Sequence, residues 1–348
     1  MFNGHPVLDV HAHVSHPMAG MGQLYMFMQA TNEAIESPIN TAQAAQFGLD
    51  DEAFAVTVAS HLAYIDERDI DVQVLGPRPF LMLADMADYL LPAWTRAIND
   101  TIAKQVSMHP DRFLGACQLP QDIHAPDSSH LLPELRRCVD DLGFVGVYLS
   151  PDPEGRHDAP GLAEPWYDAL YAECEARGLP IIVHGTNCRD PRFKHVPFNY
   201  QLGFVAEQYW ANQVLSHSDV FDRFPGLKVL ICHCGGALDR WMPNDPHLSH
   251  RDLTDNLFYD TCAHDELYLE CAIKQRGAER MVFGTEAPGS GSTVRLGDGP
   301  SKTADDLVPI VGGFDFLSDA QKLTIFQANP ERLFPAMARL AQDRCATV

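Results

Sequence analysis

Two histidines separated by one residue, His11 and His13, stand near the start of the chain at the end of an apolar run. In an extended strand, successive side chains alternate between faces, so both imidazoles point the same way and Ala12 points the other way. Two neighbouring imidazoles at a strand end can hold a metal ion. The motif is also common by chance, and two unrelated histidines at a sheet edge would fit it equally well. Whether the pair binds a metal therefore depends on where the other titratable residues of the chain lie.

Three further metal-capable side chains stand at the ends of later apolar runs. His184 ends the run 179–184, His233 ends the run 227–233 and Glu286 ends the run 280–286. If these runs are parallel strands of one barrel, their C-terminal ends meet at a single face, where barrel enzymes carry their active sites. Five such side chains at one mouth are hard to explain by chance, and they predict a shared metal site.

The types of donor indicate which ion and what chemistry to expect. Imidazole nitrogens with one carboxylate suit one Zn²⁺ ion first, with Mn²⁺, Fe²⁺ or Co²⁺ as alternatives, and are typical of catalytic sites. No strand ends in a lysine that could be carbamylated to bridge two ions, so we expect a single ion. His233 is then free to act as acid or base. Cys232 and Cys234 flank it, but strand alternation would point both thiols away from the histidine, which weighs against a cysteine-rich zinc site.

The elements that position these side chains are short apolar runs separated by helical segments. Near-continuous apolar strands that alternate with helices are typical of a parallel sheet, and eight of them predict an α/β fold of the (β/α)₈ TIM-like type. No Gly-x-Gly-x-x-Gly or Walker motif indicates a nucleotide-binding sheet. The predicted strands are 6–13, 69–77, 112–120, 143–149, 179–184, 227–233, 256–261 and 280–286.

The domain organisation follows from the same pattern. We expect residues 1–348 to form a single barrel domain. The segment 15–50, which has no clear period and follows the first strand, is predicted to be an insertion near the active site. The segment 318–348 is predicted to contain C-terminal closing helices.

Composition limits the partners of this protein. A net charge of -22 argues against a nucleic acid or an anionic membrane as partner. A small anionic substrate stays possible, because a metal ion and a few arginines can reverse the field inside one pocket. The nine scattered cysteines indicate reduced thiols. No apolar run reaches the length of a membrane span and no secretion signal is evident, so we expect a cytoplasmic protein.

The whole constellation resembles the amidohydrolase superfamily: His11-x-His13, His184, His233-x-Gly-Gly and an acid on strand eight. Within it, the chain is similar to the branch of the aminocarboxymuconate-semialdehyde decarboxylases. Those decarboxylases usually carry an aspartate in a Gly-Ser-Asp-Tyr-Pro-like motif on strand eight. This chain has Glu286 in Phe-Gly-Thr-Glu-Ala-Pro, which resembles the 4-oxalomesaconate hydratases. Further stretches are similar to those hydratases, namely 76–78, 143–153 and 258–262, and the chain closes on Asn-Pro-Glu-Arg-Leu-Phe at 329–334.

The resemblance to the hydratases implies roles for particular residues. His11, His13, His184 and Glu286 would bind the metal, and hydroxide would add to a conjugated carbon–carbon double bond. Tyr200, in the long loop after His184, falls where the hydratases carry an acid/base tyrosine. Catalysis would involve Tyr200, His233 and Glu286, although a packing role fits Tyr200 as well. Four arginines could hold the carboxylate of the substrate, or could form surface ion pairs instead: Arg78, Arg189, Arg192 and Arg295.

We therefore expect a metal-dependent lyase that acts on a small unsaturated or aromatic carboxylate in aromatic-compound degradation. Three alternatives stay open. One is non-oxidative decarboxylation of an aromatic or muconate-type carboxylate, and another is hydrolysis of a lactone or amide. The third is a barrel that binds metal without catalysis and serves as an assembly partner. The family resemblance also implies a homo-oligomer, a dimer or larger.

Overall fold

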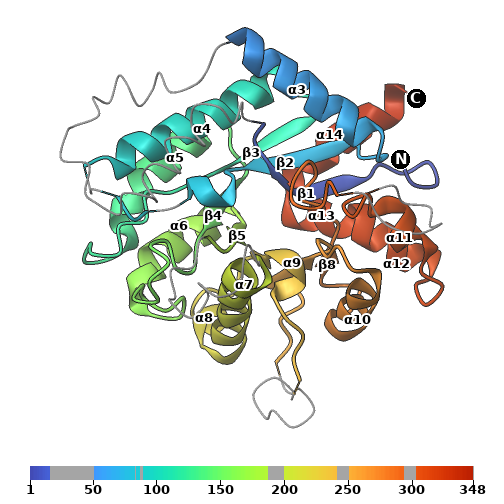
Figure 1. Cartoon of the computed structure of the whole chain (residues 1–348). Coiled ribbons are helices and arrows are strands. Elements are labelled where there is room, and N and C mark those ends of the chain that lie inside the picture. Colours follow the sequence, from blue (N-terminus) through green and yellow to red (C-terminus); the bar gives the residue numbers. More distant parts are fainter. Residues whose placement is uncertain are drawn as a thin grey trace.

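Eight parallel strands stand at the centre of the molecule and helices surround them (Figure 1). The computed structural model describes residues 1–15, 51–82, 84–86, 89–186, 200–240, 251–293 and 303–347. The strands pair in sequence order from β1 to β8. The chain after β8 returns to β1, because Val10 N–H donates to Phe283 O at 2.9 Å and Glu286 N–H donates to His11 O at 2.7 Å. The predicted (β/α)₈ barrel is therefore confirmed.

The strands are shorter than the apolar runs that predicted them. They are β1 (Leu8–His13), β2 (Val72–Gly76), β3 (Phe113–Cys117), β4 (Gly146–Leu149), β5 (Ile181–Val183), β6 (Val229–Ile231), β7 (Leu257–Asp260) and β8 (Met281–Val282). The helices of the described residues are α3 (Asp51–Asp66), α4 (Leu91–Met108), α5 (Leu132–Asp140), α6 (Asp168–Arg177), α7 (Tyr200–His217), α8 (Val220–Arg223), α9 (Cys232–Gly235), α10 (Glu266–Arg276), α11 (Val308–Gly313), α12 (Asp319–Leu323), α13 (Asn329–Leu333) and α14 (Pro335–Thr347).

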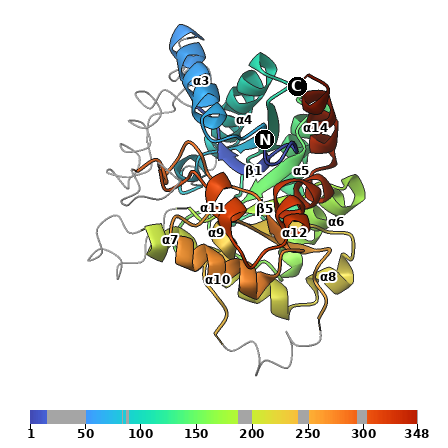
Figure 2. The same ribbon diagram turned by 90° about the vertical axis from the view of Figure 1, so that its right-hand side faces the viewer.

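Side chains alternate along each strand between the barrel interior and the layer beneath the helices. On β4, Tyr148 lies in the interior cluster, whereas Val147 and Leu149 belong to the outer cluster. Phe334, between α13 and α14, joins the interior cluster and packs under Gly146, the first residue of β4. Helix α14 lies at the opposite end of the barrel from α9 (Figure 2). Polar side chains lie at the other end of the barrel, where the C-terminal ends of the strands meet.

A β-bulge in β1 reverses which side chains face the barrel interior. Asp9 pairs with Gln73 and Ala12 with Leu75, so β1 contains one residue more than β2 over this stretch. Before the bulge, Leu8 and Val10 point into the interior cluster, whereas Ala12 belongs to the outer cluster after it. Unbroken alternation from Leu8 would have turned His11 toward the helices. The bulge re-aims both histidines into the mouth, as bulges beside active sites commonly do.

Two predicted placements near strand ends are wrong. His233 does not end a strand, because β6 stops at Ile231 and His233 lies in the short α9 with a left-handed backbone at φ 53°. The alternation argument about its neighbouring thiols therefore does not apply, and the two thiols do not share a face: Cys232 joins the interior cluster and Cys234 the outer one. Tyr200 does not lie in a loop: it is the first residue of α7.

The predicted domain boundaries stay predictions. The segment 15–50 lies outside the described residues except for Ser15. In the part of the chain that the structure describes, no helix combines the length and the hydropathy needed to cross a membrane.

A buried polar network connects α3 to the start of the barrel. Nε2 of His61 donates to Oε1 of Gln73 at 2.8 Å, and Nδ1 of His61 lies 2.6 Å from the hydroxyl of Ser15. The amide of Gln73 in turn donates to Asp9 at 2.8 Å. Burial lowers the pKa of His61 to about 4, because a charged imidazole would lose its hydration there. His61 is therefore neutral in the folded protein at neutral pH.

This network predicts a pH-dependent stability. The unfolded chain binds a proton at His61 below pH 6.5 and the folded protein only near pH 4, so acid favours unfolding in this window. We expect His61 to remove up to about 3 kcal/mol of unfolding free energy between these pH values. Urea unfolding of wild type and His61→Gln at pH 7 and pH 4.5 measures it, with a shallower loss expected in the variant. Equal losses in the two proteins would contradict the assignment.

Candidate metal centre

His11 is held by a buried carboxylate on the neighbouring strand end. Its Nδ1 donates to Oδ2 of Asp260 at 2.7 Å, and neither side chain is exposed to solvent. Its Nε2 is also buried and has no hydrogen-bond partner within the described part of the chain. Metal-binding histidines characteristically donate one nitrogen to a carboxylate and present the other to the ion. His11 has this arrangement.

His184 and His13 present further nitrogens to the same place. Nδ1 of His184 donates to the carbonyl of Gly185 at 2.7 Å, which leaves Nε2 buried and without a hydrogen-bond partner among the described residues. The ring centroid of His13 lies 5.1 Å from that of His11 and 5.3 Å from that of His184. Nε2 of His13 lies 3.2 Å from Oε1 of Glu286. Three buried imidazoles therefore surround one point.

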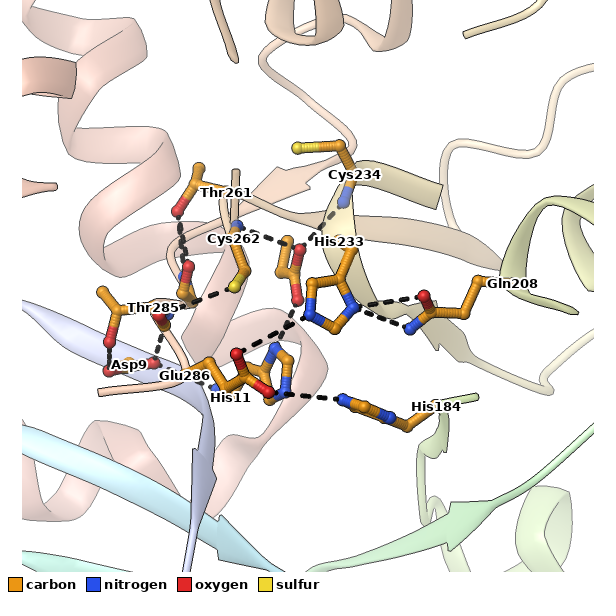
Figure 3. A network of polar contacts seen from close by, with 12 residues as sticks. Asp9, His11, His184, Gln208, His233, Cys234, Thr261, Cys262, Thr285 and Glu286 are labelled. Carbon is orange, nitrogen blue, oxygen red and sulfur yellow. Dashed lines mark hydrogen bonds and ion pairs between the residues drawn. The ribbon is translucent and has the colours of Figure 1, made fainter. Parts of the chain in front are cut away.

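Glu286 reaches this point through an unusual backbone. It follows β8 by four residues and has a left-handed φ of 60°. The preceding Gly284 permits the close approach, because a Cβ there would lie only 3.0 Å from Cβ of His11 and 2.9 Å from Cβ of Asp260. The side chain then points to the histidines, with Oε1 3.9 Å from Nε2 of His184 (Figure 3).

The four residues fit a divalent metal ion. One donor atom from each of His11, His13, His184 and Glu286 lies within 4.8 Å of the others, and all four side chains are buried. Buried polar atoms normally have hydrogen-bond partners, so the unpaired nitrogens of His11 and His184 need an explanation. A shared cation supplies one. Three imidazoles and one carboxylate are also donors that a divalent transition metal accepts.

The electrostatics of these groups agree with this fit. Burial lowers the pKa of His13 to about 3 and that of His184 to about 4, so both are neutral with lone pairs available. Burial alone would raise the pKa of Glu286, but its contacts with His13, His184 and His233 hold it well below the usual value. His13 and His184 are therefore neutral nitrogen donors and Glu286 is an ionised carboxylate, whereas the contact with Asp260 raises the pKa of His11 against the effect of burial.

His233 lies beside the four residues and has a different environment. Its side chain is 15% exposed, and its Nε2 lies 3.8 Å from Oε2 of Glu286. Its Nδ1 lies 2.9 Å from Nε2 of Gln208 and 3.1 Å from Oε1 of the same amide, which belongs to α7 (Figure 3). Because the amide offers both a donor and an acceptor, it can support either neutral tautomer of His233. This is an environment suited to a residue that gains and loses a proton.

The other predicted site residues are placed less completely. Arg78 follows β2, and its Nε is buried without a hydrogen-bond partner in the described regions. The negative charge of Glu286 favours the protonated form of Arg78. Burial lowers the pKa of Arg78. Arg189, Arg192 and Arg295 lie outside the described residues. The side chain of Tyr200 lies outside them too.

Two acids that the sequence analysis did not single out support the centre. Asp260 holds His11 and also accepts the backbone N–H groups of Cys234 and Cys262 at 3.0 and 3.1 Å. Asp9 accepts the N–H of His11 at 3.0 Å and the hydroxyl of Thr285 at 2.6 Å, and so connects β1 to the end of β8. Burial raises the pKa of Asp9 to about 6. An acid as the last residue of an apolar strand was the available signal for Asp260.

Replacing Asp260 by asparagine is expected to weaken metal binding. The amide keeps the size of the side chain but removes the charge that orients His11 and raises its basicity. Loss of such a supporting partner typically reduces metal affinity by roughly 10- to 100-fold. Competition with a chelator of known affinity measures this, and Asp255→Asn, at an exposed acid before β7, is the control. An unchanged affinity in Asp260→Asn would contradict this role.

Comparisons with known proteins give matches along most of the chain. A family profile described as Amidohydrolase matches residues 8–336. A protein of Sphingobium sp. named 2-keto-4-carboxy-3-hexenedioate hydratase is 30% identical over 299 residues, which cover 83% of this chain and 85% of that protein.

Solved structures share the fold. The 4-oxalomesaconate hydratase of Rhodopseudomonas palustris superposes with a TM-score of 0.78 at 21% identity, covering 97% of this chain and 98% of the other. A dihydroxybenzoic acid decarboxylase of Polaromonas sp. with bound manganese superposes with a TM-score of 0.65 at 20% identity, covering 96% and 98%. At these identities the structures establish the fold alone.

Proposed function

Because this chain belongs to the amidohydrolase family, we propose that it is a metal-dependent hydro-lyase that adds water to a carbon–carbon double bond of a small unsaturated carboxylate. The observation that carries this proposal is the buried cluster of His11, His13, His184 and Glu286 with His233 beside it. The 30% identity to a protein named as a hydratase supports the type of reaction. Aromatic-compound degradation, where such carboxylates arise, is the proposed context.

The proposed cofactor is one divalent ion, Zn²⁺ in the first place, held by those four residues. When bound, such an ion supplies Lewis-acid chemistry and makes water acidic enough to act as a nucleophile near neutral pH. Neutral imidazoles with a carboxylate support the choice of Zn²⁺. Manganese in a structure of the same fold keeps Mn²⁺ as an alternative, and Fe²⁺ and Co²⁺ suit the same donors.

His233 is the proposed acid/base residue. Its Nε2 faces Glu286, while Gln208 contacts Nδ1 and accommodates both tautomers. Hydration of a conjugated double bond adds oxygen to one carbon and a proton to its neighbour, so a positioned proton donor accelerates the step. Tyr200 is the second candidate donor, on the family resemblance.

Arg78 is the proposed anchor for the carboxylate of the substrate. Its buried Nε has no hydrogen-bond partner within the described residues, and the planar, bidentate donors of a guanidinium match a carboxylate. Negative charge that develops on the substrate during addition would be stabilised by the same cation. Arg189, Arg192 and Arg295 are further proposed contacts. A cytoplasmic location and a homo-oligomer complete the proposal.

The reaction class is tested by mass balance. Metal-loaded protein is incubated in ¹⁸O-labelled water with 2-keto-4-carboxy-3-hexenedioate, and separately with 2,6-dihydroxybenzoate. The proposal expects the first compound to gain one labelled water and neither to release CO₂. Release of CO₂ from the dihydroxybenzoate without hydration of the other compound would assign the chain to the decarboxylases instead. Matches to decarboxylases of the same fold make this the second candidate.

A further inference from the structure

A second group of metal-capable side chains lies beside the first and shares Glu286 with it. His233, Cys262 and Glu286 each offer one donor atom, and these atoms lie within 4.8 Å of one another. The two carboxylate oxygens of Glu286 face different neighbours. Oε1 lies 3.2 Å from Nε2 of His13, whereas Oε2 lies 3.8 Å from Nε2 of His233 and accepts the hydroxyl of Ser290. The carboxylate thus stands between two sets of donors.

We propose that His233, Cys262 and Oε2 of Glu286 form a second, weaker site for a thiophilic divalent cation, Zn²⁺ or Cd²⁺, whose occupation inhibits the enzyme. Imidazole, thiolate and carboxylate together are donors that these ions accept and that Mg²⁺ does not prefer. Nitrogen and oxygen ligands that each lie about 2.0–2.2 Å from one ion are separated by less than about 4.4 Å. The 3.8 Å between Nε2 of His233 and Oε2 of Glu286 meets this condition.

The thiol of Cys262 is positioned for this role. It is 2% exposed, and its S–H donates to the carbonyl of Thr285 at 3.5 Å, on the side of Glu286 that His233 also faces (Figure 3). Binding replaces the S–H bond by a sulfur–metal bond and releases the proton to solvent. His233 is the least buried of the three side chains, at 15% exposure, and is therefore the donor that an ion from solvent would reach most directly.

The same contacts explain why the second site is weaker and inhibitory. It offers three protein donors where the first site offers four, and an ion must displace the thiol proton. The two sites share one carboxylate, so a second cation also meets the charge of the first. An ion on Nε2 of His233 occupies the atom that the proposed hydration needs for proton transfer. This inference goes beyond the proposed function, because binding of the ion is independent of turnover.

Cadmium titration tests the site directly. Metal-free protein is titrated with Cd²⁺ while thiolate-to-cadmium absorption in the ultraviolet and bound ions per chain are recorded. For wild type we expect binding to rise from about one to about two ions per chain, with the absorption growing mainly over the second. Cys262→Ser is expected to stop at about one ion without that absorption. Cys271→Ser, at an exposed thiol of α10, is the control that behaves like wild type.

Two further measurements keep the test decisive if Cys262→Ser folds poorly. Circular dichroism shows whether Cys262→Ser is folded. If it is not, His233→Asn, which leaves every thiol in place, should weaken the affinity for the second Cd²⁺ ion at least tenfold. With Zn²⁺, the ratio of activity at excess metal to activity at one equivalent should fall in wild type and in Cys271→Ser. Excess Mg²⁺ should leave this ratio unchanged. Absorption that persists in Cys262→Ser, or never appears in wild type, would overturn the site and leave the proposed hydration unaffected.

Discussion

Replacing His184 by alanine is expected to abolish tight metal binding and activity together. His184 supplies a buried, neutral nitrogen without a hydrogen-bond partner among the described residues, and alanine leaves the remaining three donors with an open side. The loss of affinity should exceed the roughly 100-fold that removal of a supporting partner costs, because a direct ligand is lost. Elemental analysis after dialysis, together with activity of the same sample, measures both effects.

The control for this variant is His124→Ala, which removes a histidine 66% exposed to solvent and paired with Glu154. It should retain wild-type metal content and activity. Metal at the wild-type level in His184→Ala would remove this residue from the ligand set. A folded His184→Ala protein that lacks metal and stays fully active would contradict a metal-dependent reaction.

Replacing His233 by asparagine is expected to separate chemistry from metal binding. Asparagine can keep a contact with Gln208, but it cannot exchange a proton, so kcat should fall by roughly 10²- to 10⁴-fold. The tightly bound ion should stay, because the four ligands of the first site are unchanged. Steady-state kinetics and elemental analysis on the same preparation measure the two effects.

Gln208→Ala is the matched variant for His233→Asn. It removes the amide that holds Nδ1 and leaves the imidazole, so a smaller loss of kcat and a shifted pH profile are expected. If His233→Asn instead lost its metal, His233 would be a ligand and not the acid/base residue. If it kept full activity, proton transfer would have to be assigned to another group.

The general position of the centre could be predicted from the sequence, because parallel strands of a barrel bring their C-terminal ends to one face. His184 is the simplest case. Ile182 points into the barrel interior, Val183 points outward, and His184 directly after β5 points inward again. Alternation alone places this side chain correctly.

The other members of the centre needed local backbone features that no periodic pattern contains. His11 faces the mouth because of the bulge in β1, without which the alternation from Val10 would have turned it away. His233 and Glu286 follow their strands by two and four residues, and left-handed backbones with φ of 53° and 60° turn their side chains inward. Residues other than glycine rarely adopt this conformation, so it could not be predicted from residue type.

Asp260 was missed for a related reason. An acid at a strand end is visible in the sequence, but its role depends on the neighbour across the sheet. The carboxylate lies 2.7 Å from Nδ1 of His11, a residue 249 positions away in the chain. Only the closure of the barrel between its last strands and β1 creates that contact. Supporting residues of this kind are set by tertiary structure and not by local pattern.

A crystal structure of the protein loaded with one equivalent of Zn²⁺, with anomalous data at the zinc edge, tests the central claim most directly. We expect one anomalous peak per chain, about 2.0–2.2 Å from a nitrogen of His11, of His13 and of His184 and from an oxygen of Glu286. Asp260 should keep its hydrogen bond to His11 in that structure. A peak at other residues, or no peak in a protein that is fully active, would contradict the metal centre.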